Sequence, residues 1–178
     1  MAEVQGKAGT RRLFLALWPD VTQRRQIADL AHPLTGGRKV NAENLHLTLI
    51  FLGNTDSQRQ QCYEQALQNI SVPSFTLTLD LLGYWPKPHI LWLGTSQPLS
   101  DLAGLVWELQ KRLIGCGFKP KTRPFNAHVT LARKFPGPPP EAVVHRPVIW
   151  PVQRIALIES CPQADGVYYH VLRYWPEH

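Results

Sequence analysis

Two short segments of this chain carry the same two chemically competent residues at the same spacing. In "NLHLTLIFLG", His46 is followed two positions later by Thr48, and in "NAHVTLARKF", His128 is followed by Thr130. Alternate residues of a β-strand point to the same side, so each strand would present an imidazole and a hydroxyl on one face. Leucine and valine occupy the positions between and would bury the other face. We therefore expect two strands that offer two histidines and two threonines to a common cleft.

These residue types favour acid–base chemistry on an anionic group. Two imidazoles with pKa values of about 6.5 can divide the roles at neutral pH. The neutral ring takes a proton from a nucleophile, and the protonated ring gives one to a leaving group. Threonine hydroxyls can donate hydrogen bonds to phosphate oxygens. The set suits in-line attack on a phosphodiester without a metal ion.

Other interpretations fit the motifs less well. A zinc site is a poor fit because neither motif adds a cysteine or a carboxylate to its histidine. Serine-based hydrolysis is also a poor fit because the chain has no GxSxG segment. A single histidine in a strand is more often structural, but two in matching motifs are hard to explain in that way. We expect no metal and no cofactor.

The surrounding sequence predicts alternating strands and helices. Strands are expected at 12–18, 44–53, 75–85, 89–95, 127–135, 148–160 (bent at Pro151) and 167–175, from apolar runs or strict alternation bounded by Gly and Pro. Helices are expected from the capping residue Asp20 to Pro33, over 56–70 and over 99–114. Each half of the chain thus runs strand, helix, loop and His-x-Thr strand. A weak internal duplication, with two lobes about a pseudo-twofold axis, explains this order.

Composition agrees with a small globular protein that meets an anionic partner. The 178 residues suffice for one domain or two small lobes sharing a core, and the net charge is +6. Lysine and arginine are scattered along the chain, which favours a small basic cleft over a broad nucleic-acid surface. No apolar run reaches the length of about 18 residues that would indicate a membrane helix.

The cysteines and the N-terminus indicate a cytosolic protein. Cys62, Cys116 and Cys161 are an odd number without CxxC spacing, so they are predicted to be reduced, mostly packed thiols. Residues 1–10 lack the apolar stretch of a signal peptide and are expected to be a disordered lead.

The paired motifs resemble those of the two-histidine (2H) phosphoesterase superfamily. Within it, "RLFLALWP", "FTLTLD", "WLG" and "RPFNAHVTLAR" are similar to the bacterial RNA 2',3'-cyclic phosphodiesterases, also called LigT-like proteins or 2'-5' RNA ligases. The similarity covers residues 11–175. It implies a bilobal α+β fold in which antiparallel sheets form a central cleft, with the helices packed outside.

The resemblance also implies an activity and roles for single residues. The substrate would be RNA or a nucleotide ending in a 2',3'-cyclic phosphate, hydrolysed to a 2'-phosphate. His46 would be the proton donor and His128 the proton acceptor, while Thr48, Thr130 and Arg133 would hold the phosphate. Strict alternation places Arg133 on the face opposite His128, so its participation requires a bulge, or its role is indirect.

Two other functions remain open at this point. A 2'-5' RNA ligase acting on tRNA halves would use the same residues, with a 5'-hydroxyl in place of water. A non-catalytic nucleotide- or RNA-binding module is the other, although binding alone has no need for a matched acid and base. We expect residues 1–178 to form a single bilobal domain that is monomeric, cytoplasmic and not associated with membranes.

Overall fold

The computed structural model describes residues 9–138, 146–164 and 166–177, so most of the predicted lead lies outside it. The helices are α1 (Val21–Ala31), α2 (Ser57–Leu67), α3 (Ser100–Ile114) and a 3-10 turn, η1 (Ala42–Asn44). The strands are β1 (Arg11–Leu17), β2 (Arg38–Lys39), β3 (Leu47–Thr55), β4 (Phe75–Leu79), β5 (Leu81–Trp85), β6 (Ile90–Gly94), β7 (His128–Arg133), β8 (Val148–Val152), β9 (Ile155–Gln163) and β10 (Gly166–Trp175). None of the helices in the described residues is long and apolar enough to cross a membrane.

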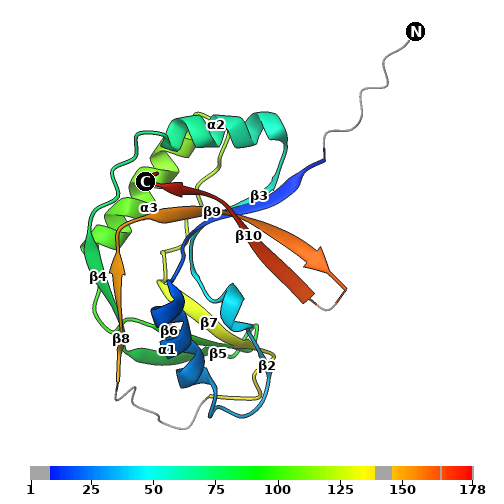
Figure 1. Ribbon diagram of the computed structural model, residues 1–178, viewed down its shortest axis with the longest axis vertical. Coiled ribbons are helices and arrows are strands. Elements are labelled where there is room, and N and C mark those ends of the chain that lie inside the picture. The colour runs from blue at the N-terminus through cyan, green and yellow to red at the C-terminus, as the bar shows by residue number, and fades with distance from the viewer. Residues whose placement is uncertain (1–8, 139–145, 165, 178) are drawn as a thin grey trace.

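The strands form one large antiparallel sheet and one small one. The large sheet has the order β10-β9-β1-β3-β7-β6-β5, with β2 beside β7, and the small sheet pairs β4 with β8 (Figure 1). The helices pack on the apolar face of the large sheet, and α2 lies beside α3. The predicted α+β class with antiparallel sheets is confirmed.

The strand β1 shows how the large sheet separates a core face from a cleft face. Leu13, Leu15 and Leu17 belong to the main core under the helices. Phe14 and Ala16 point the other way and join a smaller apolar cluster with residues of β9. Ala16 pairs with Thr48, so the polar members of the first motif lie on this second face as well.

The two motif strands meet at the centre of the large sheet. Strands β3 and β7 are joined by the pair Leu47–Val129, the middle residues of the two His-x-Thr motifs. Continuing this antiparallel register by one residue in each direction sets His46 opposite Thr130 and Thr48 opposite His128. Outward from the junction, β1 and β9 follow on one side, and β6 and β5 follow on the other. This repeated order matches the predicted internal duplication.

The predicted strand at 75–85 is wrong, because it is two strands in two different sheets. The break falls at Asp80, whose N–H donates to the carbonyl of Gly94 at 2.9 Å. Its carboxylate accepts from the N–H and the hydroxyl of Ser96, at 2.7 and 2.6 Å. These bonds pin the corner between the sheets and leave Leu81, predicted to be buried, 41% exposed.

The predicted strand at 148–160 also divides, and not at its proline. Pro151 lies inside β8 opposite Thr76, and the break follows Val152. A proline is tolerated there because β8 belongs to a two-stranded sheet and has one edge without a strand partner. The chain then crosses to the large sheet as β9.

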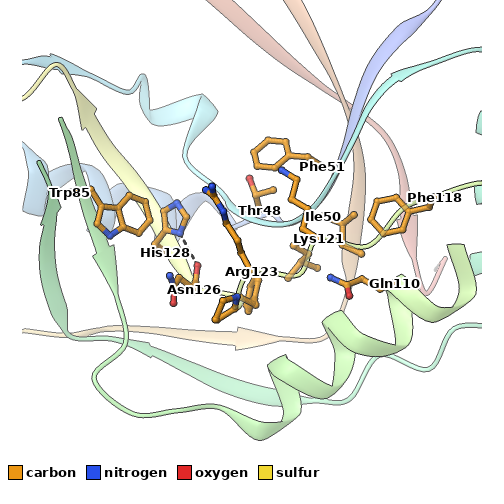
Figure 2. Close-up of a pocket in the computed structure, with 13 residues that line it drawn as sticks. Thr48, Ile50, Phe51, Trp85, Gln110, Phe118, Lys121, Arg123, Asn126 and His128 are labelled. Atoms are coloured by element: carbon orange, nitrogen blue, oxygen red, sulfur yellow. Dashed lines mark hydrogen bonds between the residues drawn. The ribbon is translucent and has the colours of Figure 1, made fainter. Parts of the chain in front are cut away.

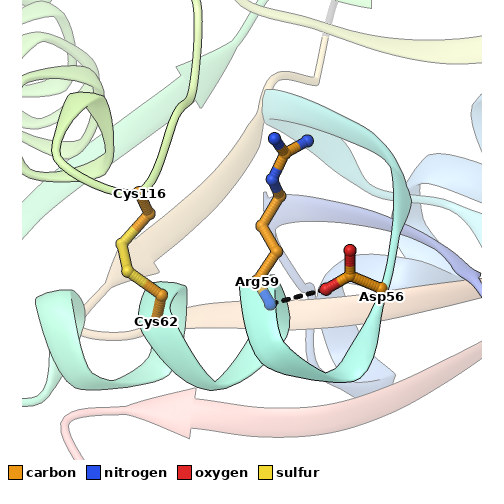
Figure 3. Close-up of a disulfide and its surroundings, with 4 residues drawn as sticks. All are labelled: Asp56, Arg59, Cys62 and Cys116. Carbon is orange, nitrogen blue, oxygen red and sulfur yellow. Dashed lines mark hydrogen bonds between the residues drawn. A yellow bond between two sulfur atoms is a disulfide. The ribbon is translucent and has the colours of Figure 1, made fainter.

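The prediction of three reduced cysteines is wrong for two of them. Cys62 on α2 and Cys116, just after α3, form a disulfide, and Cys161 is a free thiol (Figure 3). The pair is 54 residues apart in sequence, so no local spacing indicates it. The packing of α2 against the end of α3 brings the two side chains together.

Candidate active site

His46 directly precedes β3 and has both ring nitrogens engaged. Its Nδ1 lies 2.6 Å from the carbonyl oxygen of Asn44, and its Nε2 lies 3.0 Å from Oγ1 of Thr48. Because a carbonyl can only accept, Nδ1 carries the proton of the neutral ring and donates it to Asn44. Nε2 therefore holds the free lone pair and accepts from the hydroxyl of Thr48.

His128 begins β7 and repeats this arrangement. Its Nδ1 donates to the carbonyl oxygen of Asn126 at 2.8 Å. The lone pair is again on Nε2, which can take up a proton. The repeated unit is thus Asn-x-His-x-Thr, in which the asparagine backbone fixes the tautomer. The predicted site includes neither Asn44 nor Asn126, although each stands two positions before its histidine in both quoted segments.

Aromatic rings enclose His46 and shift its pKa. Trp18 stacks on the imidazole with ring centroids 5.9 Å apart, and Phe14 and Tyr169 approach to 5.0 Å. Burial behind these rings lowers the pKa of His46 to about 4, against the opposing effect of the hydrogen bond to Asn44. The positive charges of His128 and Arg133 lower the pKa further.

His128 is less enclosed but is shifted in the same direction. Trp85 meets it edge-on with ring centroids 4.6 Å apart. Burial lowers the pKa of His128, the hydrogen bond to Asn126 opposes the shift, and Arg133 adds to it. Both imidazoles are therefore neutral at pH 7 in the free protein. A proton donor at this site must gain its proton together with an anionic ligand.

One half of the cleft contains His128 together with the threonine of the other motif. We call it the aromatic half; besides His128 and Thr48, its lining includes Phe51, Trp85, Phe118, Lys121, Arg123 and Phe125. Figure 2 shows Trp85 and Asn126 beside His128, with Phe51 and Lys121 further along the pocket. Lys121 places its Nζ over the ring of Phe51 at 5.4 Å from the centroid, a cation–π contact.

The other half contains His46 together with Thr130. We call it the basic half; its lining also includes Arg38, Lys39, Asn41, Asn44, Arg133 and Tyr169. Arg133 reaches this face because of a bulge: Leu91 pairs with Ala132, whereas Trp92 pairs with Thr130. The extra residue, Leu131, resets the alternation of β7, as one of the two predicted alternatives required. The structure thus places all five predicted site residues along one cleft.

The same irregularity occurs in the first motif strand. Leu15 pairs with Ile50 whereas Ala16 pairs with Thr48, so Leu49 is the extra residue of β3. Phe51 therefore occupies the position in the first motif that Arg133 occupies in the second, five residues after the histidine. It is 57% exposed, unusual for a phenylalanine, and faces the cleft. Phe51 could have been found in the sequence by extending the alignment of the two motifs.

The described residues offer few alternatives for metal chemistry. They contain no group of three or more His, Cys, Asp or Glu side chains arranged to hold a metal ion. The titratable groups that line the two halves of the cleft are the two histidines, basic side chains and Tyr169.

Comparison with known proteins places this chain in a family. The sequence profile described as LigT like Phosphoesterase matches twice, over residues 17–92 and 93–168, once for each half. The chain belongs to the LigT-like phosphoesterases. Each match contains one of the two histidine motifs, and each contributes strands to both sides of the junction between β3 and β7.

Curated LigT-like relatives carry one name. The chain is 38% identical over 126 residues to the RNA 2',3'-cyclic phosphodiesterase of Escherichia coli, covering 69% of this chain and 72% of that protein. It is 32% identical over 130 residues to the protein of the same name from Archaeoglobus fulgidus, covering 68% of this chain and 72% of that one.

Solved structures agree over almost the whole chain. The apo form of Escherichia coli LigT has a TM-score of 0.81 and 32% identity, covering 94% of this chain and 97% of that one. The same protein complexed with 3'-AMP has a TM-score of 0.81 over 93% of this chain and 97% of that one. This LigT-like chain therefore shares its fold with a protein solved with a nucleotide.

Proposed function

We propose that this LigT-like phosphoesterase hydrolyses the 2',3'-cyclic phosphate at the end of RNA or of a nucleotide and leaves a 2'-phosphate. One observation carries the proposal: the pair Leu47–Val129 sets two Asn-x-His-x-Thr units across from each other, each with the reactive Nε2 on the cleft face. The names of the curated relatives support the choice of substrate.

The reaction needs one proton acceptor and one proton donor on opposite sides of the phosphorus. His128 takes a proton from water through Nε2, and the water oxygen forms a bond to phosphorus. The bond from phosphorus to O3' breaks, and the protonated Nε2 of His46 gives its proton to that oxygen. Thr48, Thr130 and Arg133 donate hydrogen bonds to the non-bridging oxygens, where negative charge accumulates.

The unequal halves of the cleft orient the substrate. Bases stack on aromatic side chains, so the terminal base would lie in the aromatic half, against Phe51. In a ribose the base leaves from C1', beside O2', and the upstream chain leaves from C4', beside O3'. With the base in the aromatic half, O3' faces the basic half and therefore His46. This orientation supports His46 as donor and predicts that the product retains the phosphate on O2'.

The lowered pKa of His46 couples substrate binding to the uptake of a proton. The cyclic phosphate carries one negative charge, which stabilises the imidazolium and raises the pKa of the histidine beside it. Substrate binding should therefore take up a proton at neutral pH. A ring with a low intrinsic pKa is then a strong acid toward O3' once it is protonated.

The decisive experiment is turnover of a nucleoside 2',3'-cyclic phosphate in the presence of EDTA, with the product identified by phosphorus NMR. We expect hydrolysis to the 2'-phosphate at an unchanged rate in chelator. Loss of turnover in EDTA with recovery in a divalent ion would overturn the mechanism. A 3'-phosphate as the main product would reverse the roles of the two histidines.

A further inference from the structure

Two arginines lie side by side at the outer end of the basic half. In the pairing of β2 with β7, Arg38 is directly opposite Arg133, and both line the hollow that contains His46 (Figure 1 shows β2 along β7). Directly opposite residues of an antiparallel pair lie on the same face, with Cβ atoms about 5 Å apart. Two arginine side chains therefore leave the backbone at neighbouring positions on one face, at the edge of the site.

This arrangement is built into the backbone around β2. Gly37 has a φ of +67°, and a Cβ there would stand 2.9 Å from the carbonyl oxygen of Arg133. The N–H of Val40 donates to the carbonyl of Leu131 at 2.9 Å. Lys39 is occupied elsewhere, because its Nζ donates to the carbonyl of His32 at 2.7 Å. Both residues of β2 line the basic half, and Arg38 is the one that lies directly opposite Arg133.

Like charges directly opposite each other destabilise a strand pair unless something neutralises them. Among the described residues, no carboxylate forms an ion pair with Arg38 or Arg133. The aromatic half gives the contrast: its cations are Lys121 and Arg123, and Lys121 lies over the ring of Phe51, which occupies the position equivalent to Arg133. At that position the basic half has Arg133, a second cation beside Arg38, where the aromatic half has the ring of Phe51. Two neighbouring cations without a paired carboxylate are the arrangement of an anion site.

We propose that Arg38 binds the phosphodiester that precedes the terminal nucleotide, so that the enzyme prefers an RNA end to a mononucleotide. The inference rests on the proposed function, which assigns Arg133 to the cyclic phosphate. With the base in the aromatic half, the ribose directs C5' and its phosphate toward the basic half. Arg133 acts on both histidines through its charge, and Arg38 extends the line of cations outward to the next phosphate.

The test uses three substrates that differ only on the 5' side. They are adenosine 2',3'-cyclic phosphate, the same compound with a 5'-phosphate, and the dinucleotide ApA ending in a 2',3'-cyclic phosphate. We expect kcat/KM to rise about tenfold with either 5' group, the usual scale of a hydrogen bond to a charged group. The Arg38→Gln variant should lose this advantage, so that its kcat/KM becomes the same within about twofold on all three substrates.

A matched control is Arg25→Gln, which removes an exposed arginine of α1 that lines neither half of the cleft. It should keep the full advantage. Equal rates on all three substrates in the wild type, or an equal loss on all three in Arg38→Gln, would overturn the inference. An advantage of the dinucleotide alone would also overturn it, because that result points to the second base and not to the phosphate.

Failure of the proposed function is distinguishable in the same experiment, because it removes turnover of all three substrates. The subsite is then tested by equilibrium binding of 3'-AMP and of adenosine 3',5'-bisphosphate to the full chain. A preference for the bisphosphate that Arg38→Gln removes supports the anion site. Equal affinities for the two ligands overturn it.

Discussion

The two halves of the cleft share their chemistry and differ in their walls. Each half presents a histidine held by an asparagine carbonyl, a threonine from the other motif and a strand with a bulge three residues after the histidine. Five residues after the histidine, however, one half has Phe51 and the other has Arg133. The duplication preserved a symmetric pair of histidines, and the unlike residues around it are the basis of the substrate orientation that we propose.

The walls are also fixed by different means. The basic half is closed by β2, a strand hydrogen-bonded to β7. The aromatic half is closed by residues 118–126, which have no helix or strand and begin just after the disulfide-bonded Cys116. One half is therefore closed by a strand, β2, and the other by an irregular segment that a disulfide connects to α2. The predictions below test how far the symmetry extends.

The symmetry of the acid–base pair predicts the largest effect. His46→Ala and His128→Ala should each lower kcat by about 10²- to 10⁴-fold, the usual contribution of a general acid or base. The double variant should be little worse than the poorer single one, because the two rings act as a unit. Steady-state rates on a cyclic mononucleotide, with circular dichroism to confirm folding, measure this. A folded single variant with a near wild-type rate would exclude the two-histidine mechanism.

Removing the disulfide should affect the wall of the aromatic half. Cys62→Ser, or reduction of the wild type, should lower the free energy of unfolding by about 2–4 kcal/mol, because the bond closes a long loop. Urea denaturation with and without reductant measures the change. Cys161→Ser is the control, since this thiol is unpaired, and its stability should respond to reductant as the wild type does. Unfolding curves that do not move with reductant would contradict the pairing.

The stronger enclosure of His46 predicts a stability cost in acid. Its pKa of about 4 is below the unfolded value of 6.5, so between these pH values the unfolded chain binds more protons than the native state. Stability should fall by up to about 3 kcal/mol as the pH drops through this window, at about 1.4 kcal/mol per pH unit. His46→Gln should flatten that dependence in urea denaturation between pH 7 and 4. An identical dependence in the variant would show that His46 does not resist protonation.

Phe51 should matter for the nucleoside and not for the phosphate. Phe51→Ala should raise KM for a cyclic mononucleotide, with kcat nearly unchanged. The rise should correspond to a loss of about 1–3 kcal/mol in binding free energy, the contribution of one stacked base. Because this side chain is 57% exposed, its loss should leave stability unchanged, and urea denaturation of the variant checks this. Phe51→Tyr should behave as wild type, and inhibition by inorganic phosphate should not change. A change in phosphate inhibition of the same size as the change in KM would place Phe51 at the phosphate instead.

The two threonines should show the smallest effects and should be nearly equivalent. Thr48→Ala and Thr130→Ala should each cost about 0.5–3 kcal/mol in kcat/KM, the range for a lost hydrogen bond to a charged group. The losses in kcat/KM of the two variants should be similar, although the walls of the two halves differ. A loss confined to one of them would show that the phosphate is held from one half only.

The sequence by itself determined the motif strands, the approximate extent of the helices and the histidines and threonines that we propose to act on the substrate. These follow from local regularities: alternation exposes His46 and Thr48 on one face, and Asp20 caps α1 by accepting from two backbone N–H groups of its first turn. The repeat of the motif also predicted that two such strands would meet.

Only the tertiary structure decided how those strands meet. The pairing of Leu47 with Val129, the bulge that returns Arg133 to the cleft, the corner at Asp80 and the bond between Cys62 and Cys116 all join residues far apart in the chain. A local pattern fixes which side of a strand is apolar, but it contains no information about which distant backbone lies alongside. The candidate catalytic residues could therefore be named from the sequence, whereas the two unlike walls that surround them could not.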